Sequence, residues 1–305
     1  MLENLAKMTK KAKKHGWIAG DTSVSDLPKS ELSLMCGLQP VEKPRLFLKR
    51  PEFLSKKKIP DEWDWRTCDK VSPVRTQGSC GACAAFSICG AMESQKLISS
   101  SPGSNFPNNF NADVLENDEN EKGVDSHDLS EAHLYFCSSR RCDTGSDFVS
   151  LFSFAKNTGV TKEEFFPYAS DTFNTCSLKD GFDNSDNITF LDSYTELNGV
   201  LAIKESIFNN GPVAVGMEVY DDFFHYTGGI YRHVWGGLAG YHAVLLIGYG
   251  LTKVKQRCLG TLRTKKFFIV KNSWSEGWGE DGFFRIAVGE CGIGKLGAYS
   301  LGLKP

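Results

Sequence analysis

The sequence lacks several features that would assign it to common classes of protein. No apolar run approaches the roughly 20 residues needed to span a bilayer, so we expect no membrane segment. Residues 1–20 contain no apolar core of a secretory signal, because the stretch from Met8 to Lys14 is rich in lysine. No basic-aromatic motif of the usual nucleic-acid-binding modules occurs. We therefore expect neither a membrane nor a nucleic acid as a partner.

Zinc-ribbon spacing is also missing, although the chain of 305 residues contains ten cysteines. Without paired CxxC motifs a structural zinc site is not indicated, and we expect no metal and no cofactor. Ten cysteines are more than a protein of a reducing compartment usually contains, so we expect disulfide bonds. The sequon at Asn187 is a glycosylation candidate and is compatible with the secretory route.

The net charge of −2 conceals two segments of opposite charge. Residues 1–58, here called the leader, carry 13 lysines and arginines against 6 aspartates and glutamates, a formal charge of +7. Residues 59–305, here called the body, carry 22 against 31, a formal charge of −9. A solvated lysine-rich tail would explain the leader as well as a functional role would. The leader ends in Lys56-Lys57-Lys58 just before a proline, which is typical of an exposed, cleavable junction.

Apolar spacing divides the body into a helical part and a β-rich part. Helices are predicted over residues 83–98, from residue 130 onward, over 148–157 and over 201–208. Short β-rich runs bounded by glycine follow at 211–215, 243–247, 267–270 and 282–286. This order predicts an α+β fold with a site where the two parts meet. We place a mostly helical domain at residues 59–185 and a mostly β domain at residues 186–305.

The first chemical signal is a thiol at the start of a predicted helix. Cys83 follows the glycine-containing turn Gln77-Gly78-Ser79-Cys80-Gly81-Ala82. A helix N-terminus and a nearby imidazolium both stabilise a thiolate, and can lower a cysteine pKa from about 8.5 to roughly 4. From the CxxC spacing alone, a buried disulfide or a redox pair of Cys80 and Cys83 remains an alternative. Gln77 taken alone is equally consistent with a polar surface position.

A thiolate nucleophile needs an imidazole to pair with sulfur and to protonate the leaving group. Of six histidines, His242 precedes the apolar run 243–248 and would project from a strand end beside the cleft. His127 and His133 are expected at the surface. A core histidine is the alternative for His242. Asn272 closes another predicted strand, and its amide oxygen would fix the imidazole tautomer.

These residues together resemble the papain and cathepsin family. The stretch from Cys80 matches four of five positions of the signature C-G-[SA]-C-[WY], and departs from it at Ala84. The stretches 219–226, 229–234 and 240–243 resemble cathepsin B in particular. A similar opening occurs in dipeptidyl peptidase I. Residues 17–20 and 34–38 of the leader resemble the short cathepsin B propeptide, so the chain resembles a zymogen of that type.

The resemblance implies a papain-like two-domain fold, with a helical left domain, a β-barrel-like right domain and the active-site cleft between them. It implies that Cys83 is the nucleophile, His242 its base and acid, and Asn272 the group that orients His242. Gln77 would donate to the oxyanion. It also implies the disulfides Cys80–Cys142 and Cys137–Cys176, and a cleft-crossing leader segment formed by Cys36, Gly37 and Leu38. The implied substrate-binding residues are Gly81, Thr144, Gly145, Gly240, Trp274, Trp278 and Gly294.

Departures from cathepsin B bear on specificity. Between Cys142 and Gly211 lie only 68 residues without a histidine, so the occluding loop that confers dipeptide removal is short or missing. We therefore predict a cysteine endopeptidase with an acyl-enzyme intermediate. Gly294 stands where cathepsin B has the glutamate that accepts a basic P2 residue, which predicts an apolar P2 preference. P2 is the second residue on the amino side of the scissile bond.

The resemblance further implies peptide or protein substrates, inhibition by the chain's own propeptide, cystatin-like inhibitors as partners, a monomeric state, and a secreted or lysosome- or vacuole-like acidic location. Three alternatives remain. These are a catalytically impaired pseudoprotease or binding protein, a dipeptidyl peptidase I-like exopeptidase, and a dithiol oxidoreductase. The charge of +7 on the leader against −9 on the body predicts an attraction that weakens as carboxylates are protonated near pH 4 to 5.

Overall fold

The computed structural model describes residues 2–40, 59–100, 127–169, 175–255 and 262–304. The junction Lys56-Lys57-Lys58 and Cys258 lie outside the described residues. The α-helices are α1 (Leu2–His15), α2 (Lys29–Leu34), α3 (Cys83–Ser99), α4 (Glu131–Phe136), α5 (Phe148–Asn157) and α6 (Val200–Asn210). The strands are β1 (Trp17–Ala19), β2 (Trp63–Asp64), β3 (Val160–Thr161), β4 (Ile188–Thr189), β5 (Leu191–Glu196), β6 (Val213–Tyr220), β7 (Tyr226–Tyr231), β8 (Leu238–Lys255), β9 (Leu262–Lys271), β10 (Phe283–Ala287) and β11 (Ala298–Leu303). Short 3-10 helices are η1 (Trp65–Cys68), η4 (Glu163–Phe165), η5 (Ser185–Asn187), η6 (Asp221–His225) and η7 (Glu290–Gly292).

The predicted helices of the body are present, and local chemistry explains where two of them begin. Ser130 accepts a hydrogen bond from the backbone N–H of His133 and starts α4. Asp147 does the same for Ser150 at the start of α5. Helix α3 has no side-chain cap at Ala82, so its first backbone N–H groups remain available to another group. This open N-terminus is where Cys83 lies.

One mixed sheet runs through the molecule in the order β1-β7-β10-β9-β8-β6-β11-β5, with β2 added to β8. The predicted strands correspond to β6, β8, β9 and β10, and β8 and β9 are longer than the apolar runs suggested. The edge strand β1 belongs to the leader and pairs antiparallel with β7, with Trp17 opposite Gly229. The leader therefore contributes a strand to the sheet of the body.

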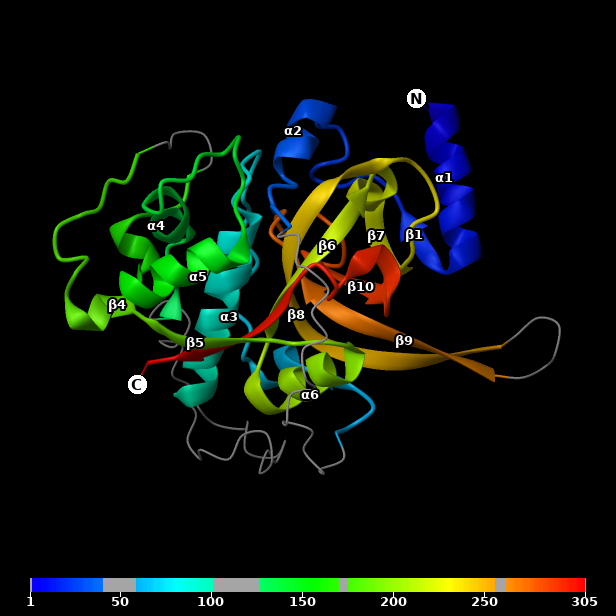
Figure 1. The fold of residues 1–305 in the computed structure, drawn as a ribbon. Coiled ribbons are helices and arrows are strands. Elements are labelled where there is room, and N and C mark those ends of the chain that lie inside the picture. The colour runs from blue at the N-terminus through cyan, green and yellow to red at the C-terminus, as the bar shows by residue number, and fades with distance from the viewer. Residues whose placement is uncertain (1, 41–58, 101–126, 170–174, 256–261, 305) are drawn as a thin grey trace.

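Two hydrophobic clusters form the core, and they place α3, α4 and α5 on one side and most of the sheet on the other (Figure 1). The helical cluster also contains Leu191, Tyr299 and Leu301 from β5 and β11. The sheet cluster also contains Trp65 and Cys68 from the start of the body. The clusters thus do not divide at the expected boundary between residues 185 and 186. Strands β5 and β11 contribute to the helical cluster, and the start of the body contributes to the sheet cluster.

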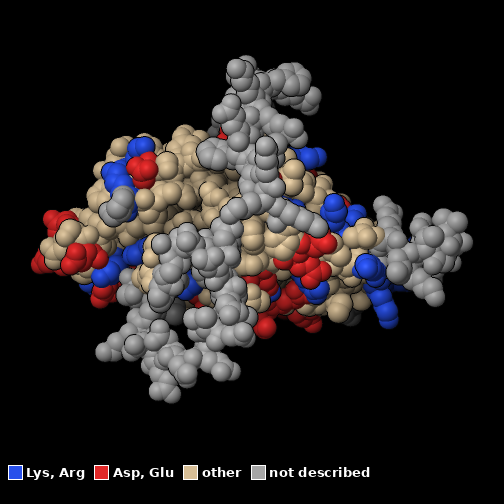
Figure 2. Space-filling model, turned by 90° about the horizontal axis from the view of Figure 1, so that it is seen from below, with Lys and Arg blue, Asp and Glu red and all other residues tan. Residues whose placement is uncertain are grey.

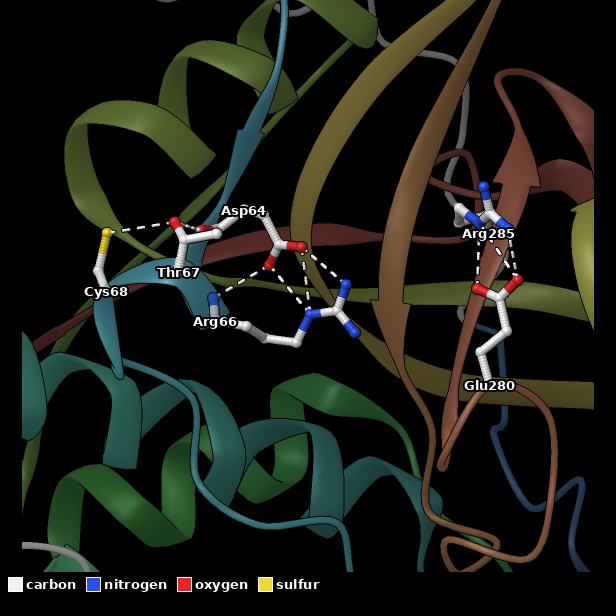
Figure 3. Close-up of polar contacts among 6 residues, drawn as sticks. All are labelled: Asp64, Arg66, Thr67, Cys68, Glu280 and Arg285. Atoms are coloured by element: carbon white, nitrogen blue, oxygen red, sulfur yellow. Dashed lines mark hydrogen bonds and ion pairs between the residues drawn. The ribbon is translucent and has the colours of Figure 1, made fainter. Parts of the chain in front are cut away.

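Two arginine–carboxylate pairs fix turns beside the sheet (Figure 3). The Asp64 carboxylate accepts from the backbone and the guanidinium of Arg66, which holds the first turn of η1 next to β2. Glu280 binds Arg285 of β10 and also accepts the backbone N–H of Gly229 at 2.9 Å. Glu280 therefore joins the turn before β10 to β7, the strand on which the leader's β1 pairs.

Charged side chains are distributed over the surface in both signs. On the face shown in Figure 2, lysine and arginine lie among aspartate and glutamate within the described residues. None of the described helices is long and apolar enough to cross a membrane.

Candidate active site

Cys83 is the first residue of α3, and its side chain is fully buried. Burial raises the pKa of the Cys83 thiol to about 11, although backbone N–H groups of Ala243, Gly37 and Ala84 act in the opposite direction. Gly37 belongs to the leader, whereas Ala243 follows His242 on β8. The leader therefore covers the thiol, and in this state the uncharged thiol is favoured over the thiolate.

His242 lies on β8, fully buried, with its Nε2 atom 2.8 Å from the Oδ1 atom of Asn272. An amide oxygen only accepts, so Nε2 carries the proton, and the Nδ1 atom of the neutral ring keeps a free lone pair. Nδ1 makes no hydrogen bond with any described residue. Burial lowers the pKa of His242 to about 4, against the opposite effects of the Asn272 side chain and the Met35 backbone. The imidazole is therefore neutral beneath the leader.

Aromatic rings enclose the contact between His242 and Asn272. The ring of Trp274 lies 4.8 Å from the ring of His242 and is almost fully buried. Trp278 packs edge-on against Trp274 at 5.1 Å and is completely buried among Phe223 and other rings of the sheet cluster. Trp278 was also expected at the substrate site, and in the zymogen its buried side chain packs against Trp274.

Gln77 is oriented by a neighbour that the sequence reasoning missed. The Ser273 hydroxyl donates to Oε1 of Gln77 at 2.6 Å, which turns the amide nitrogen the other way. Nε2 donates to the backbone carbonyls of Cys80, at 2.6 Å, and of Met35, at 3.1 Å. The leader carbonyl of Met35 thus occupies the donor of Gln77. A substrate carbonyl would need the same donor.

The leader segment after Met35 is held between the two halves by backbone hydrogen bonds. Ser146, which precedes α5, donates to the carbonyl of Gly37 and accepts from the N–H of Gln39, both at 2.9 Å. Leu38 donates to the carbonyl of Tyr241 on β8 at 3.1 Å. Each half therefore contributes one backbone position, and neither Ser146 nor Tyr241 was among the expected binding residues.

Three glycines allow the leader backbone to pass this closely. A Cβ atom added to Gly37 would lie 2.3 Å from the Cα atom of Gly81, and one added to Gly145 would lie 2.1 Å from the carbonyl oxygen of Gly37. Gly145 also has a positive φ of 64°, which favours glycine. Gly81 and Gly145 were both expected at the substrate site. Here they lie against the leader.

The other expected binding residues lie in different surroundings. Thr144 is exposed, and its carbonyl accepts from the side chain of Gln39 in the leader. Gly240 lies beside Cys36, whose thiol pKa is raised by burial and then by the proximity of Cys83. A Cβ atom on Gly294 would meet Ile203 of α6 at 2.7 Å. A side chain at position 294 would therefore point at α6, and the substrate role of Gly294 stays a prediction.

Two disulfides hold the loops around Cys83. They are Cys80–Cys142 and Cys137–Cys176, the pairs that the resemblance implied. Cys80–Cys142 joins the turn before α3 to the loop that carries Gly145, and the N–H of Gly81 donates to the carbonyl of Cys142 at 2.9 Å. Cys291 is a free thiol. The bridge fixes the two glycine positions against which the leader packs.

A buried group of charges connects the halves behind Cys83. Lys271 of β9 donates to Ser72, which donates to Glu93 of α3. Glu131 of α4 is also buried, and burial followed by the negative charge of Glu93 raises its pKa. Burial lowers the pKa of Lys271, while Glu93 and Glu131 oppose that shift. The Lys271 ammonium therefore lies near carboxylates from two helices, α3 and α4.

The described residues offer little that resembles a metal or glycan site. No group of three or more His, Cys, Asp and Glu side chains within the described ranges is arranged to hold a metal ion. The side-chain amide of Asn187 donates to Gly181 and accepts from Lys162. These two bonds disfavour attachment of a glycan to Asn187 in the folded chain.

Comparison with known proteins decides the family. The profile of the papain family of cysteine proteases matches residues 59–108 and 111–301. The chain belongs to this family. Its fold is the papain-like α+β fold, and it is a cathepsin B-like cysteine protease in zymogen form. The match begins at residue 59, where the leader was expected to end.

Relatives and solved structures agree with this assignment. "Cathepsin B-like cysteine proteinase 6" of Caenorhabditis elegans is 33% identical over 284 residues, covering 84% of this chain and 72% of the relative. "Cathepsin B-like CP3" of Giardia intestinalis is 30% identical over 298 residues, covering 91% and 86%. Procathepsin L2 from the larval midgut of Tenebrio molitor is 28% identical with a TM-score of 0.73, covering 98% of this chain and 89% of that chain. Procathepsin B S9 of Trypanosoma congolense shares the fold at 19% identity, with a TM-score of 0.75 and coverage of 100% and 98%.

Replacing Gly37 with alanine should weaken autoinhibition. The new methyl group would meet backbone atoms of Gly81 that cannot rotate away, so the leader must leave its backbone contacts with Ser146 and Tyr241. We expect the uncleaved G37A zymogen to hydrolyse a fluorogenic dipeptide at least about 10-fold faster than the uncleaved wild type. A loss of about 1.4 kcal/mol of leader binding raises the open fraction of the zymogen by a factor of about ten. Ser33→Ala, an exposed leader position, is the control. Equal rates for both variants would contradict this role for Gly37.

Replacing Gln77 with alanine should reduce turnover by the activated enzyme. Loss of one oxyanion donor typically lowers kcat by about 10²- to 10³-fold, and KM should change little because the ground-state carbonyl depends less on this donor. Gln95→Ala on the exposed part of α3 is the control. Steady-state kinetics on a dipeptidyl coumarin substrate measures both constants. A rise in KM at unchanged kcat would assign Gln77 to substrate binding instead.

Proposed function

We propose that the activated chain is a cysteine endopeptidase in which Cys83 attacks the peptide carbonyl and His242 carries the proton. Transfer of the thiol proton to Nδ1 of His242 gives a thiolate and an imidazolium. The sulfur then bonds to the carbonyl carbon, and the oxyanion receives hydrogen bonds from Gln77 and the N-terminus of α3. His242 returns the proton to the leaving amine, and water later hydrolyses the acyl-enzyme.

A single observation carries this proposal. The leader already imitates a bound peptide, because its Met35 carbonyl accepts from Gln77 while its Gly37 N–H approaches the Cys83 sulfur. Asn272 holds the Nε2 side of His242, so the free lone pair of the ring is on Nδ1. If a peptide replaced the leader, Gln77 could donate to its carbonyl, Cys83 could supply the attacking sulfur, and His242 could accept the proton. This arrangement supports acyl transfer and gives no role to a Cys80–Cys83 redox pair, since Cys80 is bonded to Cys142.

Autoinhibition depends mainly on backbone and apolar contacts. Met8, Ala12 and Trp17 of the leader are buried in the sheet cluster, and Leu38 is buried in the helical cluster. By contrast, the ion pair between Lys29 and Asp221 is 4.0 Å long, and the Lys29 side chain is 88% exposed. Exposed pairs of this kind contribute about 0–1 kcal/mol. Among the described residues, the attraction between the opposite charges of leader and body is thus a minor part of the proposed inhibition.

The remaining parts of the proposal follow from the family. We infer peptide and protein substrates, internal cleavage of them, a monomeric enzyme, sensitivity to cystatin-like inhibitors, and a secreted or lysosome- or vacuole-like acidic location. Internal cleavage rests on the absence of histidine between Cys142 and Gly211, where an occluding loop would stand. The disulfides Cys80–Cys142 and Cys137–Cys176 support an oxidising compartment.

The decisive experiment starts from the full-length chain. Incubation near pH 4.5 should release the leader, and mass spectrometry follows this cleavage. The product should hydrolyse a dipeptidyl coumarin. A thiol-directed epoxide should label the product at Cys83. Digestion of a denatured protein should give internal fragments from the first minutes. Sequential release of dipeptides would replace the endopeptidase by an exopeptidase. Labelling of Cys83 without substrate turnover would favour the pseudoprotease. The absence of both labelling and turnover would favour it as well.

A further inference from the structure

The loop 141–146 carries the part of the helical half on which the leader backbone lies. The N–H of Ser146 donates to the carbonyl of Gly37, and its carbonyl accepts from Gln39, both at 2.9 Å. Gly145 approaches the leader so closely that a Cβ atom on it would lie 2.1 Å from the Gly37 carbonyl oxygen. A peptide that replaced the leader would meet the same loop. The position of this loop relative to the nucleophile therefore decides how well a peptide backbone can bind.

The outer turn of this loop folds around a single carbonyl group. The carbonyl of Arg141 accepts from the N–H of Thr144 at 3.0 Å and from its hydroxyl at 2.9 Å. Arg141, Asp143 and Thr144 are all exposed, so these bonds face solvent on their outer side. Cys142 is tied by its disulfide to Cys80, in the turn before α3. The orientation of the turn toward α4 therefore depends on a further contact from the buried side.

Tyr135 of α4 makes that contact. Its side chain is fully buried, and its hydroxyl donates to the Arg141 carbonyl at 2.7 Å. The backbone carbonyl of Tyr135 accepts the N–H of Arg140 at 3.3 Å, just before the loop. Burial, followed by the negative charge of Cys83, raises the pKa of the Tyr135 phenol, so the hydroxyl keeps its proton and stays a donor. A buried tyrosine hydroxyl usually has a partner, and here the partner is the centre of the turn.

Tyr135 also lies where the core differs from the family signature. Ala84 follows Cys83 on α3 and is fully buried, whereas the signature has tryptophan or tyrosine at this position. Helix α3 packs against α4, and Ala84 and Tyr135 both belong to the helical cluster. The effect of the Cys83 charge on the phenol shows that the ring lies near the thiol. In this chain a large aromatic ring near the nucleophile is therefore contributed by α4.

We propose that Tyr135 is a positioning residue of the substrate site. Its hydroxyl holds the Arg141 carbonyl, and through the turn it holds Gly145 and Ser146 where a peptide backbone binds beside Cys83. This inference rests on the proposed function and adds to it a residue that itself touches no reacting atom. Loss of the hydroxyl leaves the thiol as reactive as before and weakens the binding of peptides.

The test compares the activated enzyme with its Tyr135→Phe variant, which loses one oxygen atom and keeps the ring. On a dipeptidyl coumarin we expect KM to rise about 3- to 10-fold, as for one lost neutral hydrogen bond, with kcat within about twofold. A peptidyl epoxide should label Cys83 about 3- to 10-fold more slowly at concentrations below saturation. Iodoacetamide is too small to bind the loop and should alkylate Cys83 at the wild-type rate. Tyr194→Phe is the matched control, because it removes the same atom from a tyrosine of β5 that is 40% exposed.

Several outcomes would overturn the inference. An unchanged KM in Tyr135→Phe would make Tyr135 a structural residue, and a lower melting temperature alone would agree with that. Equal losses in kcat, in epoxide labelling and in alkylation by iodoacetamide would show that the variant disturbs α3 instead of the loop. A wild type that hydrolyses no peptide would overturn the proposed function itself. Normal wild-type kinetics with an unchanged KM in the variant would overturn this inference alone.

Discussion

Replacing Cys83 with alanine should lower kcat/KM of the activated enzyme by about 10⁴-fold or more, because removal of a nucleophile leaves only the oxyanion donors and substrate binding. Folding should be preserved, since the side chain only loses a sulfur atom at the first turn of α3 and Ala84 and Ala85 follow it there. The measurement is hydrolysis of a dipeptidyl coumarin by leader-free protein, with active-site labelling by an epoxide.

Cys89 provides the matched control for that replacement. It is a free, fully buried cysteine on the same helix, two turns after Cys83. Cys89→Ala removes the same atom from the same element, so kcat/KM should remain within about threefold of the wild type even if the melting temperature falls. If both variants lost activity equally, the loss would reflect damage to α3, and Cys83 would not be the nucleophile.

Alkylation of Cys83 should be at least about 10³-fold slower in the zymogen than in the leader-free enzyme at pH 6. The thiol pKa of about 11 leaves about one thiol in 10⁵ ionised at that pH. Removing the leader returns water to the site, so the pKa of Cys83 falls and that of His242 rises from about 4. Both changes favour the thiolate and imidazolium pair, so the fraction of Cys83 present as the reactive thiolate rises.

Iodoacetamide labelling followed by peptide mass spectrometry measures this difference directly. Cys68, a buried free thiol of the body, reports on general opening of the fold and should react slowly in both forms. Equal rates at Cys83 in the two forms would mean that the leader does not cover the sulfur in solution. The zymogen would then have to be inactive for another reason.

Much of the fold and the site could be predicted from local sequence. Capping residues and apolar spacing are local, which is why the helices expected from residue 130 and over residues 148–157 are present as α4 and α5. The residue set of Cys83, His242 and Asn272 was recognisable because the motifs around these residues resemble the papain and cathepsin family. The structure brings Asn272 to His242, although 30 residues separate them in the chain.

The parts that could not be predicted depend on backbone groups and on register. Ser146 and Tyr241 bind the leader through atoms that every residue has, so no residue type reveals them. His133 was expected at the surface but is buried, because all of α4 is enclosed and the ring accepts the N–H of Thr161. Burial lowers the pKa of His133 to about 4, so it stays neutral.

The strand that the leader adds to the body changes what happens after the chain is cut. Cutting near residues 56–59 breaks one covalent link but leaves β1 paired with β7 and Leu38 buried in the helical cluster. While the two pieces are joined, the local concentration of the leader at the site is of millimolar order, and after cutting it falls to the concentration of the protein itself. Release of activity is therefore a dissociation step, and a dilute sample should gain activity more completely than a concentrated one.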